Sequence, residues 1–104
     1  SVADFEHGPI AVVDAGFPME ELNERLRLGI AESNEYDSVG GYITYVLGEI
    51  PAPGTVIDQD KLTWKVEKVN GQRIEEVKLA SKEPWPDEVL VEAGMTPPSR
   101  DSAN

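Results

Sequence analysis

The 104-residue sequence contains no cysteine and a single histidine, His7. The absence of cysteine excludes disulfide bonds, thiolate metal sites and cysteine nucleophiles. One histidine without a fixed partner is more often a surface residue than a general base or a metal ligand. The chain therefore offers few of the side chains from which transition-metal sites are built.

Long apolar runs are missing as well. The longest run, Ile10–Val13, has four residues, whereas a membrane-spanning helix needs about 18 or more. We therefore expect no membrane insertion by this fragment. If the domain works at a membrane, another part of its parent protein must hold it there.

Basic residues are scarce, with 9 lysines and arginines against 20 acidic residues and a net charge of −11. Residues 1–60 carry 12 of the acids and only 2 of the bases. No basic stripe exists to neutralise phosphates, which excludes nucleic acid as a partner. An acidic face attracts cations or basic partners, although such faces more often serve solubility alone.

No motif for catalysis or nucleotide binding is present. No glycine-rich loop follows a strand and opens a helix, and no serine lies in a nucleophile elbow. Asp58 and Asp60 begin like a calcium loop, but its sixth and twelfth positions hold Thr63 and Val69 instead of glycine and glutamate. We predict a protein that is not an enzyme, with no catalytic residue and no metal ligand.

The first half of the chain predicts one strand and one helix. Ile10–Val13 is a β-branched apolar run that indicates a buried strand. Apolar residues at helical spacing then predict a helix over about 18–28, with Pro18 in its first turn. Glutamates near its start and arginines near its end complement the helix dipole. Gly29 is the expected stop.

A second helix is predicted over about 39–47, with Ser38 as its N-cap and Gly48 as its end. Gly40 and Gly41 oppose a helix, because each glycine costs up to about 1 kcal/mol relative to alanine. A glycine pair in the first turn suggests that another backbone or a ligand approaches closely. We expect Gly41 in particular to be intolerant of bulk for this reason.

The second half predicts three strands. Thr55–Ile57 is a short strand and Asp58–Asp60 a turn, after which apolar and polar residues alternate from Leu62. Asn70-Gly71 marks the tip of a hairpin.

Two strand registers are compatible with the two faces of that hairpin. A two-residue loop sets Val66 opposite Glu75, which suits Asn-Gly chemistry. A four-residue loop over 70–73 sets Val66 opposite Val77 and pairs apolar residues at every step. We favour the second register. In it Trp64 faces Leu79, and Val69 faces Ile74.

Prolines interrupt the last 25 residues. We assign residues 1–80 to the folded domain and 81–104 to a proline-rich C-terminal extension, in which Val89–Val91 forms a brief docked strand. Trp85 lies between two prolines, and we expect this aromatic ring to dock on its own domain or on a partner.

These elements predict an α+β fold in the order βααβββ, with two helices packed on a small, mainly antiparallel sheet. The buried face is expected to contain side chains from both the hairpin and the first helix: Trp64, Val66, Val77, Leu79, Leu22 and Leu26.

The ordered segments of the chain resemble the transporter-associated domain of the CorC/HlyC family. The resemblance covers about residues 8–80 and depends on five segments: Met19–Asn23, Leu28–Ile30, Glu35–Gly41, Leu47–Gly54 and Val66–Ile74. Two positions depart from the family, since Phe17 stands where a capping threonine or serine is common and Ser38 replaces threonine.

The resemblance implies a regulatory or accessory domain of a bacterial membrane protein for magnesium and cobalt efflux, or of a hemolysin-like protein. In such proteins the domain follows a membrane region and a pair of CBS domains, which would be its partners at the cytoplasmic face of the inner membrane. Two alternatives remain open. The similarity of the fold to part of FAD-binding domains implies a flavin or nucleotide module, and a domain for dimerisation or docking needs no small ligand.

The acidic loop and the glycine pair are the candidate contact site for a ligand or partner. Its expected residues are Tyr36, Asp37, Gly40, Gly41 and Tyr42.

Overall fold

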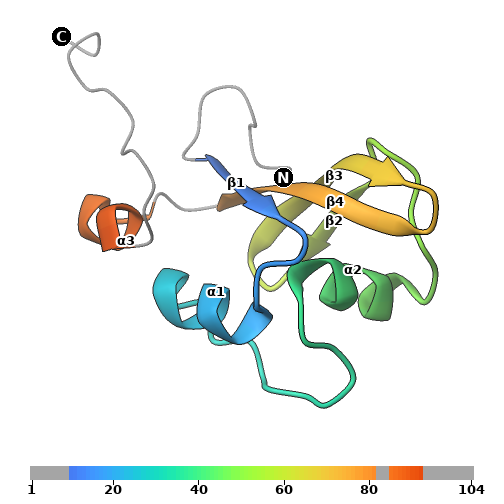
Figure 1. Cartoon of the computed structure of the whole chain (residues 1–104). Helices are drawn as coiled ribbons and strands as arrows, with labels where there is room; N and C mark the ends of the chain where they lie inside the picture. Colours follow the sequence, from blue (N-terminus) through green and yellow to red (C-terminus); the bar gives the residue numbers. More distant parts are fainter. Residues whose placement is uncertain (1–9, 82–84, 93–104) are drawn as a thin grey trace, which may run out of the picture.

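The computed structural model describes residues 10–81 and 85–92, in which helices cover one face of a single sheet (Figure 1). The elements in chain order are β1 (Ile10–Asp14), α1 (Met19–Leu26), α2 (Val39–Leu47), β2 (Val56–Gln59), β3 (Leu62–Asn70), β4 (Arg73–Ser81) and α3 (Asp87–Glu92). Up to β4 this is the predicted order βααβββ. The predicted α+β class is confirmed.

The sheet has the strand order β1-β4-β3-β2, and every neighbouring pair is antiparallel. The first strand of the chain thus pairs with the last, from Ile10 opposite Ala80 to Asp14 opposite Glu76. Closing the sheet in this way leaves α1 and α2 as the connection between β1 and β2, on one side of the sheet (Figure 1).

The favoured register of the β3–β4 hairpin is confirmed, with Trp64 opposite Leu79 and Val66 opposite Val77. The loop is shorter than predicted, because Asn70 and Arg73 also pair. Only two residues remain in the turn, and Gly71, the first of them, has a φ of 64°. A glycine with positive φ at this place is typical of a type II′ turn, so the apolar register and a tight turn occur together.

The predicted turn at Asp58–Asp60 is wrong. The strand continues through Gln59, which pairs with Leu62, and the turn consists of Asp60 and Lys61. Both turn residues are in the left-handed region, with φ values of 56° and 62°. A two-residue hairpin of type I′ requires positive φ at both positions, which matches the twist of the flanking strands.

The first helix is shorter than the predicted 18–28. Pro18 occupies the N-cap position, and the helix ends before Arg27, whose φ is 55°. Arg27 rather than Gly29 therefore makes the left-handed cap. The second helix matches the prediction at both ends, since the Ser38 hydroxyl accepts from the N–H of Gly41 and Gly48 closes the helix with a φ of 78°.

The predicted strand at Val89–Val91 is also wrong, because Asp87–Glu92 is a helix, α3. Two acidic residues in its first turn favour a helix start electrostatically. Trp85 and Val89 are 8% and 2% exposed and join the core of the domain, and α3 contacts α1. Trp85 thus docks on its own domain. His7 lies outside the residues that the structure describes.

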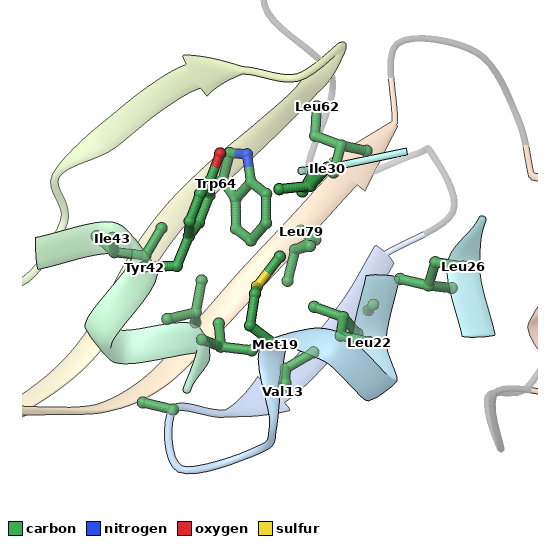
Figure 2. Packing of buried hydrophobic residues seen from close by; sticks show 14 of the residues in the cluster. Val13, Met19, Leu22, Leu26, Ile30, Tyr42, Ile43, Leu62, Trp64 and Leu79 are labelled. Atoms are coloured by element: carbon green, nitrogen blue, oxygen red, sulfur yellow. The ribbon is translucent and has the colours of Figure 1, made fainter. Parts of the chain in front are cut away.

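The core lies between the helices and the inner face of the sheet, where Met19, Leu22, Trp64 and Leu79 converge (Figure 2). Trp64, Val66, Val77 and Leu79 have no exposed surface, and Leu22 and Leu26 are each 2% exposed. The predicted buried face is confirmed.

The outer face of β3 and β4 carries charge instead. Lys65 and Lys78 lie opposite each other, and the Glu67 carboxylate lies 3.5 Å and 3.7 Å from their ammonium groups. One oxygen of Glu67 accepts no hydrogen bond, so its interaction with the two lysines is ionic. The carboxylate offsets the repulsion that two directly opposed lysines would otherwise produce.

Replacing Val66 by Asp should abolish folding, because a carboxylate would be buried among apolar side chains without a partner. The expected loss is more than about 4 kcal/mol of unfolding free energy. Chemical denaturation followed by circular dichroism measures it. Lys68→Asp is the control, since it places the same carboxylate two residues along the strand on an exposed position. If both variants unfold at the same denaturant concentration, the assigned core face is incorrect.

Candidate functional site

The candidate site is built around the start of α2. Its first two N–H groups donate to backbone carbonyls of the segment after β1: Val39 to Phe17 at 2.9 Å and Gly40 to Ala15 at 2.8 Å. The third, from Gly41, donates to the capping serine at 3.0 Å. These N–H groups are therefore already used, and this helix start cannot offer them to a phosphate.

The same segments also bond in the opposite direction, because the N–H of Met19 donates to the carbonyl of Asp37 at 2.8 Å. Pro18 and Ser38 form an antiparallel bridge. The two helix starts are thus joined by a short piece of β-like pairing, which fixes the loop between the helices at both of its ends.

The glycine that approaches another element is Gly40, not Gly41. A Cβ atom on Gly40 would lie 3.0 Å from the Cβ and 3.3 Å from the carbonyl oxygen of Ala15. On Gly41 it would meet Ser38 Oγ at 3.2 Å and Tyr36 Cβ at 3.6 Å, in the segment that leads into its own helix. The predicted close approach of another element to Gly41 is therefore wrong, because a Cβ atom on Gly41 would point toward the segment that leads into its own helix.

Four aromatic rings form a row from the loop to the core. Tyr36 contacts Tyr42 edge-on at 4.9 Å between ring centroids and Tyr45 at 5.4 Å. Tyr42 in turn lies 5.4 Å from Trp64. Such pairs contribute about 0.5–1.5 kcal/mol each beyond the area they bury. The row joins the loop before α2 to the centre of the sheet.

At the inner end of this row, the polar groups of Tyr42 and Trp64 both have hydrogen-bond partners. The hydroxyl of Tyr42, which is 4% exposed, donates to the carboxylate of Asp60 in the β2–β3 turn. The indole N–H of Trp64 donates to the carbonyl of Gln59 at 3.0 Å. Burial raises the pKa of the Tyr42 hydroxyl, and the hydrogen bond to Asp60 and its negative charge raise it further. Tyr42 is therefore a neutral donor that holds the turn against α2.

An acidic hollow of about 430 Å³ lies beside the row, between the start of α1 and the loop after it. It is lined by Met19, Glu20, Asn23, Ile30, Ala31, Glu32, Ser33, Asn34, Tyr36 and Asp37. Among the described residues, this lining has three carboxylates and no basic side chain, and all three carboxylate residues are exposed. The hollow therefore attracts cations but leaves its acids in water.

Asn23 shapes this hollow, and the sequence reasoning missed its role. Its side-chain oxygen accepts from the N–H of Ile30 at 2.9 Å, and its amide nitrogen donates to the carbonyl of the same residue. An asparagine side chain that bonds both backbone groups of one residue holds that residue as a neighbouring strand would. The one signal in the sequence was the asparagine within the Met19–Asn23 segment of the resemblance.

The profile of the CorC_HlyC family, the transporter associated domain, matches residues 8–83 of this chain. The chain belongs to the CorC_HlyC family. No curated protein matches its sequence.

Solved CorC_HlyC structures share the fold. The domain from Nitrosomonas europaea is 25% identical with a TM-score of 0.65, over 79% of this chain and 98% of that one. A region associated with a Mg²⁺ and Co²⁺ transporter from Neisseria meningitidis MC58 is 19% identical with a TM-score of 0.66, over 77% and 96%. A domain of a Xylella fastidiosa Temecula1 hemolysin, solved in complex with Mg²⁺ and Mn²⁺, is 24% identical with a TM-score of 0.62, over 79% and 96%.

The five expected contact residues occupy different places in this CorC_HlyC domain. Tyr36 and Asp37 line the acidic hollow. Tyr42 points inward to Trp64 and Asp60, Gly40 is buried against Ala15, and Gly41 is half-buried. Only the first two residues are therefore placed to touch a ligand in the hollow, and their role as contacts stays a prediction.

Within residues 10–81 and 85–92, no three acidic, histidine or cysteine side chains gather closely enough to hold a metal ion. Within the same ranges no helix combines the length and the apolar character that crossing a membrane requires.

Gly40→Ala should destabilise the domain by about 1–3 kcal/mol, because the new methyl group is forced against Ala15. Gly41→Ala is the matched test. It gains up to about 1 kcal/mol of helix propensity, but its methyl group crowds the capping hydroxyl of Ser38 at 3.2 Å. The two effects oppose each other, so its stability should change less than that of Gly40→Ala. Thermal unfolding measures both variants. Equal destabilisation of the two would contradict the assignment of the close approach to Gly40.

Tyr42→Phe should reduce the loss of stability at alkaline pH. Because the folded-state pKa of Tyr42 is raised, its contribution is fully present below about pH 10 and is lost as the pH rises further. Urea unfolding at about pH 9 and about pH 11 measures the difference, with the exposed Tyr45→Phe as control. If Tyr42→Phe loses as much unfolding free energy at alkaline pH as the wild type does, the Tyr42–Asp60 pair is not the cause of that loss.

Proposed function

We propose that this CorC_HlyC domain is a non-catalytic regulatory module of a bacterial ion-transport protein and that it modulates the transport of divalent cations. The observation that carries the proposal is the acidic hollow. Glu20, Glu32 and Asp37 surround a space of about 430 Å³, and none of the described residues that line it is basic. Two related structures support the choice of cation, one described as a region associated with a Mg²⁺ and Co²⁺ transporter and one solved in complex with Mg²⁺ and Mn²⁺.

The hollow gathers cations without chelating them. Its acids are exposed, and Mg²⁺ releases its own water reluctantly, so it needs near-octahedral oxygen ligands to bind tightly. Association is therefore weak and sensitive to salt, since charges in water are screened over about 8 Å at physiological ionic strength. Weak association suits a module that responds to ion concentration rather than one that stores ions.

The parent protein that we propose contains a membrane region and a pair of CBS domains, with this domain at the cytoplasmic face of the inner membrane. The family resemblance supports this arrangement. The CBS pair and the membrane region would be its partners, and self-association into a homodimer is a further proposal that solution mass would test.

A flavin does not fit the candidate site. The pyrophosphate of FAD needs N–H donors or basic side chains, yet the first three N–H groups of α2 are bonded within the protein. The lining of the adjacent hollow is acidic, which repels phosphate. The geometry thus favours a cation-responsive module over the flavin alternative.

Deleting residues 8–92 from the full-length product of the gene should leave transport in place but change its dependence on cellular Mg²⁺ or Co²⁺. The triple variant Glu20→Gln, Glu32→Gln, Asp37→Asn should shift this dependence in the same direction, because it removes the charge of the hollow. Cellular metal content, measured by mass spectrometry over a series of external concentrations, is the readout.

The control neutralises three exposed acids elsewhere, as Glu49→Gln, Asp58→Asn and Glu75→Gln. It matches the change in net charge and should leave the dependence as in the wild type. Unaltered transport after the deletion, or equal shifts in the two triple variants, would argue against a regulatory role for the hollow.

A further inference from the structure

A second cavity, separate from the acidic hollow, lies where the end of α1, the β2–β3 turn and α3 meet, and its volume is about 410 Å³. Its lining is mostly apolar: Leu26, Leu28, Leu62, Trp85, Pro86 and Val89. Four of these side chains are at most 8% exposed, so they belong to the packed core. A concave apolar space with a few polar groups at its edge is the usual form of a small-molecule site.

Both cations of this lining are exposed residues, Arg27 and Lys61. They are notable in a chain whose net charge is −11. One acid, Asp60, also lines the cavity, and its carboxylate already accepts the hydroxyl of Tyr42. Among the described residues of the lining, the polar edge of the cavity thus holds two cations and one acid, which favours an anionic ligand over a cationic one.

The backbone at this cavity is also unusual. Among the described residues, the non-glycine residues with positive φ are Arg27, Asp60 and Lys61, and each of them lines the cavity. A left-handed conformation is unfavourable for a residue with a side chain. Such residues gather at functional sites when the surrounding structure holds them. Here they bring two cations to one apolar opening.

We infer that this cavity binds a monomeric aliphatic carboxylate of the fatty-acid type. The alkyl chain would lie against Trp85, Val89 and Leu28, and the carboxylate would lie between the guanidinium of Arg27 and the ammonium of Lys61. Guanidinium and carboxylate groups form charge-assisted, often bidentate hydrogen bonds. The apolar lining supplies the driving force for the chain. The site does not depend on the proposed response to cations, because the acidic hollow has a separate set of lining residues.

The test uses the whole 104-residue chain and its tryptophan fluorescence, to which Trp64 and Trp85 both contribute, with decanoate as the probe. We expect a saturable change in emission with one decanoate bound per chain. Acetate, which has the head group without the chain, should produce no change, and decyltrimethylammonium, which has the chain with the opposite charge, should bind much more weakly. Methyl NMR signals of Leu28 and Val89 should shift with the same titration curve, which locates the ligand.

The double variant Arg27→Asn, Lys61→Asn removes both charges while keeping residues that tolerate the left-handed conformation. Its dissociation constant for decanoate should rise about tenfold or more, since charged hydrogen bonds to the carboxylate are lost. The control, Arg25→Asn with Lys68→Asn, removes two cations that lie outside the cavity lining and should bind like the wild type. Circular dichroism verifies that both variants are folded.

Three results would overturn the inference. The first is equal affinity for decanoate and decyltrimethylammonium, which would mean unspecific apolar adsorption. The second is unchanged decanoate affinity in the cavity double variant. The third is binding to anionic phospholipid vesicles with no response to monomeric decanoate, which would assign the cations to a membrane surface.

Discussion

The burial of Trp64 is the constraint on which the rest of the domain depends. Its ring is completely buried opposite Leu79, it contacts Tyr42, and its N–H is satisfied by the carbonyl of Gln59. A buried indole that lacked an acceptor would leave a polar group unpaired at a cost of about 1–3 kcal/mol. The hairpin register, the position of α2 and the extent of β2 all have to satisfy this one side chain. This shared dependence explains why the tight Asp60–Lys61 turn keeps its left-handed conformation.

The second organising feature is the backbone pairing between the two helix starts. It joins the segment after β1 to the segment before α2, and it requires a residue without a side chain at Gly40. Because the pairing uses the N–H groups of α2, it removes an anion site and at the same time fixes the loop that forms the acidic hollow. The same hydrogen bonds therefore stabilise the fold and leave the first three N–H groups of α2 unavailable to an anion.

The two proposed sites lie at opposite ends of α1 and differ in the charge of their described lining residues. The acidic hollow lies at the start of α1, and the apolar cavity with its two cations lies at the end of the same helix. Tyr42 connects the two regions, because its ring contacts Tyr36 at the hollow and its hydroxyl reaches Asp60 at the cavity.

Local patterns in the sequence determined the class of the fold, the ends of α2 and the apolar register of the hairpin, because capping residues and alternation act between near neighbours. Local patterns also placed Tyr36 and Asp37 in an acidic loop. They did not determine α3, the left-handed turn at Asp60, or the difference between Gly40 and Gly41. Those features depend on contacts between distant segments: Val89 against the core, Tyr42 with Asp60, and Gly40 with Ala15. Only tertiary packing decides such contacts, because it selects among conformations whose local energies differ by about 1 kcal/mol.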